Sequence, residues 1–195
     1  MKKGKFSDYV YRKLPGFDMN SFEGANQAIP MKTLVIHCLD PRGVDIPRAI
    51  AEYLGDEVYP GEIITDEHGT RVGSTATLFV ATNAGGRAAF ALQSVAAMDY
   101  IFHVKNVAVV HHSFCGTTTL TPDLMIEKFR DHYHTDISKL FDHDSLAIMD
   151  FEESLNYDVK LLRKSPAVPE RVKLYGFFYE ISTGKLTEVV RDIPG

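Results

Sequence analysis

Two cysteines and one histidine have the residue types and spacing of a transition-metal site. Cys115 follows His112 by three residues, and Cys38 lies far upstream of both. Two thiolates and one imidazole leave one place of a tetrahedral zinc ion open, an arrangement known from catalytic zinc sites. Magnesium and calcium prefer oxygen ligands, so this donor set favours zinc. The alternative is that both cysteines are inert buried thiols, which is common in intracellular proteins.

His111 is the rival ligand in the same segment. Successive side chains of a strand point to opposite faces, so His111 and His112 do not easily reach one ion together. We prefer His112 because its His-x-x-Cys spacing closes a short chelate across a turn. The other histidines are expected at the surface or packed against helices; they are His37, His68, His103, His132, His134 and His143.

Asp40 and Arg42 follow the first cysteine at an interval of two residues. A zinc-bound water can have a pKa near ~7 and so supply hydroxide at neutral pH. An ionised carboxylate only accepts hydrogen bonds, so Asp40 would accept the hydroxide's proton and direct its lone pair at a substrate. Arg42 would hold Asp40 in place and keep it ionised. A surface ion pair without a catalytic role is the alternative, and such pairs contribute little to stability.

A turn of small residues, Asn83-Ala84-Gly85-Gly86, lies between these two motifs. It lacks the glycine spacing of dinucleotide-binding loops and the Gly-Lys-Ser/Thr of phosphate-binding loops. Its small side chains allow the backbone to approach another group closely. Its residues also allow a helix to start here with free N–H groups. The turn is therefore either a plain tight turn or a backbone contact for substrate through Asn83, Ala84 and Gly85.

Strand and helix patterns alternate along most of the chain. Apolar, β-branched runs predict strands over 33–38, 76–82, 106–112 and 171–181, and a last strand that ends at 190. Helical patterns occupy 45–53, 87–103, 122–132 and 148–163. Outside these elements, we expect a short helix over 6–14, and a loop over 55–75 with at most a short strand.

This alternation predicts the α/β class, with a single domain around a mainly parallel central sheet flanked by helices. Open parallel sheets bind ligands outside the carboxyl ends of their strands. Cys38, the 83–86 turn and the 112–115 segment all come at such strand ends. One crevice would therefore collect all three, and this convergence favours a metal site over inert thiols.

The composition is that of an ordinary globular chain of 195 residues, 45% hydrophobic and 24% charged, which excludes disorder. A net charge of −5 offers no basic footprint for nucleic acid. Neither an apolar run of the ~18 residues needed to cross a membrane nor a secretory signal is evident. We expect a cytoplasmic protein without nucleic-acid or membrane partners, in which two cysteines suit metal binding better than a disulfide framework.

Taken in order, the motifs resemble those of the β-class carbonic anhydrases. Residues 38–42 are similar to the family's Cys-x-Asp-x-Arg, residues 83–85 to its Asn-Ala-Gly, and residues 112–116 to its His-x-x-Cys-Gly. Residues 175–186 resemble its closing strands. The resemblance implies a β-carbonic-anhydrase-like fold and a zinc lyase that converts carbon dioxide reversibly to bicarbonate. It implies roles for six residues: Cys38, His112 and Cys115 as zinc ligands, Asp40 and Arg42 as the orienting dyad, and Gly116 as a backbone contact for substrate.

The resemblance also implies a homodimer or a higher homo-oligomer. On this basis residues 1–29 would form an N-terminal helical arm, and residues 30–195 the zinc-binding catalytic domain. The arm has no obvious place in the core of a single domain, which is why we assign it to assembly.

Three departures from the family pattern keep other functions open. Pro41 stands where the family usually has Ser or Ala, Thr82 stands where it commonly has Arg, and the 55–75 stretch is longer. A related branch hydrolyses carbonyl sulfide or carbon disulfide with the same ligands, so the ligands alone do not decide the substrate. A non-enzymatic zinc-binding relative, with Asp40 as a fourth ligand, is a further alternative. A thiol-redox protein is disfavoured because there is no Cys-x-x-Cys.

Overall fold

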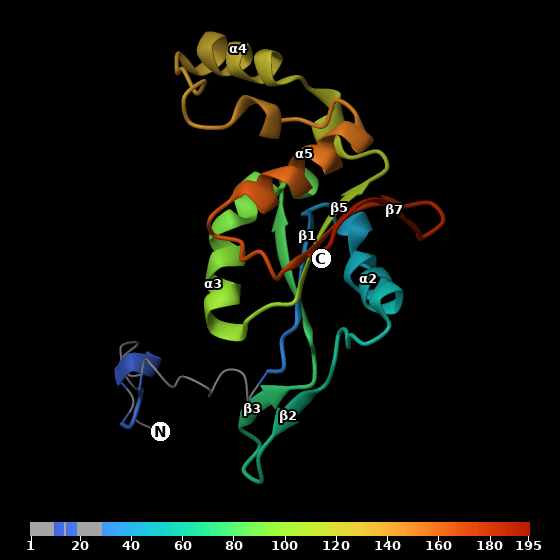
Figure 1. Ribbon diagram of the computed structural model, residues 1–195. Coiled ribbons are helices and arrows are strands. Elements are labelled where there is room, and N and C mark those ends of the chain that lie inside the picture. The colour runs from blue at the N-terminus through green and yellow to red at the C-terminus, as the bar shows by residue number, and fades with distance from the viewer. Residues whose placement is uncertain (1–9, 14, 19–28) are drawn as a thin grey trace.

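A five-stranded sheet organises the molecule (Figure 1). The computed structural model describes residues 10–13, 15–18 and 29–195. The strand order is β4-β1-β5-β6-β7, and the strands are β1 (Thr33–Cys38), β4 (Leu78–Asn83), β5 (Asn106–His112), β6 (Lys173–Glu180) and β7 (Lys185–Asp192). The first four run parallel, and β7 pairs antiparallel with β6. The predicted α/β fold with a mainly parallel sheet is therefore confirmed.

Helices cover both faces of the sheet (Figure 1). α3 (Leu92–Phe102) and α5 (Phe151–Lys164) pack on one face, and α2 (Ile46–Leu54) packs on the other. Alternate residues of the central strands serve the two cores, so Val107 and Val109 pack with α3 and α5 while Ala108 and Val110 pack with α2. Strands buried on both faces read as continuous apolar runs, which is why the sequence identifies them.

Most predicted boundaries differ from the observed ones by only a few residues, and capping explains several differences. α2 ends where Gly55 adopts a left-handed conformation with φ 79°. α5 begins at Phe151 and not at 148, because the Asp150 carboxylate accepts from the N–H of Glu153 at 2.9 Å. The predicted helix over 87–103 opens with a 3-10 turn, η5 (Ala88–Ala91), before α3. α4 (Pro122–Tyr133) matches its prediction closely.

The 55–75 stretch, predicted as a loop with at most a short strand, holds a two-stranded hairpin. β2 (Ile63–Thr65) pairs antiparallel with β3 (Arg71–Ser74). The connecting turn is closed by Asp66, whose carboxylate accepts from the backbone N–H groups of His68 and Thr70. Such side-chain turns are hard to distinguish from irregular loops in a sequence.

The short helix predicted over 6–14 falls mostly outside the described residues, which here show one 3-10 turn, η2 (Tyr11–Lys13). The assignment of residues 1–29 to an arm therefore remains a prediction. Across the described parts of the chain, none of the helices has the length and apolar character needed to cross a membrane.

Candidate metal centre

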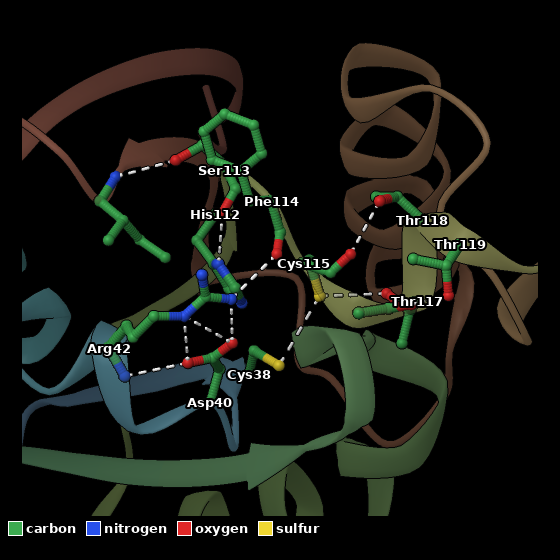
Figure 2. Close-up of polar contacts among 12 residues, drawn as sticks. Cys38, Asp40, Arg42, His112, Ser113, Phe114, Cys115, Thr117, Thr118 and Thr119 are labelled. Carbon is green, nitrogen blue, oxygen red and sulfur yellow. Dashed lines mark hydrogen bonds and ion pairs between the residues drawn. The ribbon is translucent and has the colours of Figure 1, made fainter.

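The three predicted metal-binding side chains come together at the carboxyl edge of the sheet. Cys38 is the last residue of β1, His112 is the last residue of β5, and Cys115 follows after a short turn. One donor atom from each lies within 4.8 Å of the other two, and all three residues are buried. Figure 2 shows the two sulfurs facing each other. The topology of parallel strands is what brings these distant residues to one place.

The spacing of the sulfurs suits a shared ion. Sγ of Cys38 lies 3.7 Å from Sγ of Cys115. A disulfide would need about 2.05 Å, so the two cysteines are free thiols. Two sulfurs that each lie about 2.3 Å from a tetrahedral zinc ion are roughly 3.8 Å apart. The observed distance therefore fits tetrahedral coordination.

His112 presents an unused nitrogen to these sulfurs. Its Nδ1 donates to the carbonyl oxygen of Ser113 at 2.9 Å, which leaves the lone pair on Nε2. Nε2 is buried and has no hydrogen-bond partner. Ser113 is itself fixed, since its N–H donates to Tyr179 at 2.9 Å and its hydroxyl accepts from the N–H of Ile181 at 3.0 Å. A buried, oriented and unpaired nitrogen is the state expected of a metal ligand.

The two thiols differ in acidity. Burial raises the pKa of Cys38. Burial acts on Cys115 in the same direction, but the neighbouring imidazole of His112 and the hydroxyl and backbone of Thr117 outweigh it and lower the pKa of Cys115 to about 7. The Thr117 hydroxyl lies 3.1 Å from Sγ of Cys115. Cys115 is thus prepared to bind as a thiolate, which is the form that coordinates metal.

His111 points away from this group, to the opposite face of β5. Its Nε2 lies 3.2 Å from the carboxylate of Asp158 in α5, and both side chains are fully buried. Burial lowers the pKa of His111. His37, which we expected at the surface or packed against a helix, is buried in β1 on the face that α2 covers.

Asp40 and Arg42 form a close ion pair beside the ligands (Figure 2). Nη2 of Arg42 donates to Oδ2 of Asp40 at 2.6 Å, and Nε donates to Oδ1 at 3.0 Å. The same Nη2 also donates to the Phe114 carbonyl at 3.0 Å, which links the pair to the turn before Cys115. These hydrogen bonds hold the pKa of Asp40 well below its usual range. Within the described residues, Asp40 is not part of the close donor group.

The turn at 83–86 supports the site mainly through its backbone. The side-chain amide of Asn83 is engaged with the backbone of Arg87, accepting at 2.7 Å and donating at 3.0 Å. The backbone of Gly85 acts to lower the pKa of the Cys38 thiol, against the larger effect of burial. Gly86 has φ 67°, and a Cβ there would lie 2.7 Å from the backbone N of Cys38. Of the predicted substrate contacts, Ala84 and Gly116 are exposed, whereas Gly85 is buried.

Sequence reasoning missed the groups behind the sulfurs. Ile148 and Phe151 form an apolar cluster with the two cysteines. Arg87 and Asp158 form a buried ion pair nearby, with Nε of Arg87 2.9 Å from Oδ2 of Asp158. One signal was available, because Arg87 is a charged residue in a stretch that otherwise consists of small and apolar residues.

Comparisons with known proteins agree with this geometry, although no protein-family model matches the chain. The chain is 26% identical to β-carbonic anhydrase 1 of Mycobacterium tuberculosis over 98 residues, which covers 50% of the chain and only 58% of that relative. It is 26% identical to the carbon disulfide hydrolase of Acidianus over 205 aligned positions, covering 93% of the chain and 84% of that enzyme.

The fold agrees as well. The structure matches that of carbonic anhydrase from Streptococcus mutans with a TM-score of 0.60 at 24% identity, over 88% of this chain and 96% of that one. The resemblance indicated by the three motifs is thereby confirmed.

Proposed function

We propose that this chain is a member of the wider β-class carbonic anhydrase family, taken to include carbon disulfide hydrolase, and that it is a zinc enzyme that hydrates carbon dioxide reversibly to bicarbonate. The observation that carries the proposal is the group of Cys38, His112 and Cys115, with the carboxylate of Asp40 held beside it and outside it. Three protein ligands with a fourth place open are the mark of a catalytic zinc site, since a structural site is closed by four.

Zinc would be held by Sγ of Cys38, Nε2 of His112 and Sγ of Cys115. When bound, it supplies Lewis acidity that activates water for attack on an electrophilic carbon. The protein contributes a fixed acceptor next to the open place. Asp40 is ionised and only accepts hydrogen bonds, so it orients any donor in the open place in one direction. Arg42 keeps Asp40 turned towards itself and so keeps this carboxylate from closing the site as a fourth ligand.

Hydrolysis of carbonyl sulfide or carbon disulfide is the second candidate, and three observations favour it. The match to the Acidianus carbon disulfide hydrolase extends over nearly the whole chain. Leu39, next to Cys38, and Phe114, next to Cys115, are apolar side chains that are 63% and 80% exposed. A cavity of about 350 Å³ beside Phe114 is lined largely by apolar side chains such as Ile148 and Phe151.

Carbon dioxide remains our first choice because the ligands and the Asp40–Arg42 pair are all present. The proposed zinc-binding, non-enzymatic alternative needs Asp40 as a ligand, and the four hydrogen bonds that Asp40 accepts from Arg42 oppose this.

We also propose that the protein is a homodimer or a higher homo-oligomer. In the described sheet β4 is an edge strand, and its Val80 is 37% exposed. Unpaired strand edges with apolar side chains favour association. Deleting residues 1–28, the proposed arm, is expected to weaken assembly. Light scattering on the full chain and on the deletion variant tests this, and a full-length monomer at micromolar concentration would contradict it.

One experiment decides between the candidates. Protein purified without added metal should contain about one zinc per chain, and the Cys115→Ser variant less than about half of that. The zinc-replete protein is then assayed for kcat/KM with carbon dioxide, carbonyl sulfide and carbon disulfide in parallel. Hydration of carbon dioxide well above background supports the proposal. Turnover of a sulfur substrate with background hydration of carbon dioxide replaces it by the second candidate, and zinc-replete protein inactive on all three is a binding protein.

A further inference from the structure

A buried ion pair lies behind the metal centre, on the side of the sheet covered by α5. Arg87 donates to both carboxylate oxygens of Asp158, from Nε at 2.9 Å and from Nη2 at 3.2 Å. The Arg87 side chain is 2% exposed and that of Asp158 is 0% exposed. Charged side chains are almost never buried to this degree unless they are paired, and removing one partner leaves the other charge uncompensated.

Arg87 also holds the segment that leads into α5. Its Nη1 donates to the carbonyl of Ala147, and its Nη2 donates to the carbonyl of Asp144 at 3.1 Å. Its own backbone is bound by the side chain of Asn83. One guanidinium thus joins the turn after β4, the 144–147 segment and α5. A lysine could not do this, because an ammonium lacks the planar fork of five donors.

The segment held by Arg87 covers the two sulfurs. Ile148 is 1% exposed and packs with Cys38 and Cys115 in one apolar cluster. Its N–H donates to the carbonyl of Thr117 at 3.4 Å, in the turn that follows Cys115. Ile148 therefore shields the two sulfurs on this side, and its hydrogen bond restrains the turn that follows Cys115.

Asp158 contacts the residue before the third ligand, on the opposite face of β5. Its Oδ2 lies 3.2 Å from Nε2 of His111, the residue before His112. Since an ionised carboxylate only accepts, Nε2 of His111 carries the proton. This contact holds the carboxyl end of β5 in place from the face opposite to His112.

We propose that Arg87 and Asp158 are positioning residues of the metal centre, which set the metal affinity by holding the ligand-bearing turns and the Ile148 cover in place. The inference rests on the proposed zinc site and adds a determinant of affinity that touches neither metal nor substrate. Residues that orient metal ligands from outside the coordination sphere commonly change metal affinity 10–100-fold when replaced.

The variants Asp158→Asn and Arg87→Lys test the proposal. Asp158→Asn keeps the shape and removes the charge, and Arg87→Lys keeps the charge and removes the fork. The zinc dissociation constant is measured by competition with a chelator, and the absorption spectrum of the cobalt(II)-substituted protein reports ligand geometry. We expect both variants to bind zinc about 10–100-fold more weakly than the wild type and to alter the cobalt spectrum.

Two controls separate positioning from loss of stability. Asp99→Asn breaks another Arg–Asp pair, in which Arg171 donates to Asp99 at 2.6 Å near the amino ends of the strands. Leu174→Ala removes a fully buried side chain at the same end of the sheet. Both controls should lower stability and keep wild-type zinc affinity and the wild-type cobalt spectrum. Wild-type affinity and spectrum in folded Asp158→Asn and Arg87→Lys would overturn the inference.

A measurement on the wild type covers the case in which the variants do not fold. Affinity coupling is reciprocal, so zinc should in turn stabilise the groups that position it. Zinc is expected to slow amide hydrogen exchange in 83–88 and 144–148 but not in 99–105. Unchanged exchange in the first two segments would refute the inference. A wild type that binds no zinc at all would instead refute the proposed function.

Discussion

Two Arg–Asp pairs flank the metal centre, and they differ in almost every physical respect. Asp40 and Arg42 are two residues apart, and their side chains are 15% and 51% exposed. Arg87 and Asp158 are 71 residues apart and almost completely buried. Both pairs are bidentate, so the geometry of the contact itself is shared.

This difference in burial indicates that the first pair can take part in the chemistry of the site, whereas the second stabilises the fold around it. Where one partner is half exposed, as Arg42 is, water screens the pair and its mutual attraction contributes little to stability. Asp40 can therefore respond to a group beside it without disturbing the fold. Removing one partner of a buried pair strongly destabilises the folded protein, since the other charge is left without compensation. Arg87 and Asp158 are thus suited to hold segments together.

The largest effect is expected from Asp40→Asn. The amide adds N–H donors and removes the anion, so kcat should fall by about 10²–10⁴-fold while zinc content and unfolding midpoint stay near wild type. Asp45→Asn, a nearby exposed carboxylate without a capping hydrogen bond, is the matched control. Near wild-type turnover would remove Asp40 from the mechanism, and loss of zinc would identify it as a ligand.

A large loss of stability is expected from Asp158→Asn. Removing one charge of the buried pair should lower the free energy of unfolding by about 3–5 kcal/mol, measured by denaturant titration of the zinc-free protein. Asp99→Asn should cost less, because its partner Arg171 is half exposed. Equal losses in the two variants would show that burial does not distinguish these pairs.

These two pairs also mark what could be predicted from the sequence. Cys38, Asp40 and His112 were found because strand ends are encoded locally in apolar, β-branched runs, and parallel topology then brings them together. The α/β fold followed from the same runs. Asp158 lies in an amphipathic helix, and no local pattern shows that its side chain meets Arg87 and His111. The 3-10 turn before α3 was missed for a related reason, since propensity does not separate it from the helix it opens.

A smaller effect is expected from Thr117→Val, which removes the hydroxyl at Sγ of Cys115 and nearly keeps the volume. Loss of this hydrogen bond should raise the thiol pKa above its value of about 7. In zinc-free protein, the pH profile of Cys115 alkylation should move upward by about one pH unit. Thr119→Val is the control, because the Thr119 hydroxyl donates to the Gly116 carbonyl and not to the sulfur. If the two variants had the same alkylation profile, the role assigned to the Thr117 hydroxyl would be contradicted.

The smallest effect is expected at His143, an exposed histidine that lies between two carboxylates. His143 lies 3.0 Å from Asp123 and 3.2 Å from Asp144, and these contacts raise its pKa above 6.5. A raised folded-state pKa stabilises the protein below the unfolded value, and this stabilisation is lost as the pH rises through the folded value. His143→Gln should therefore lower the melting temperature slightly near about pH 5 and leave it unchanged near about pH 8.5. An equal change at both pH values would contradict this.

The order of the strands has a consequence for biosynthesis. β1 pairs with β4 and β5, and β5 pairs with β6, so the sheet joins segments that leave the ribosome far apart in time. During synthesis Cys38 emerges as an unpartnered thiol, well before His112 and Cys115 follow, and the Ile148 cover comes later still. We expect the nascent chain to acquire zinc only after α5 has been translated. Until then the thiol of Cys38 depends on the reducing power of its surroundings to stay intact.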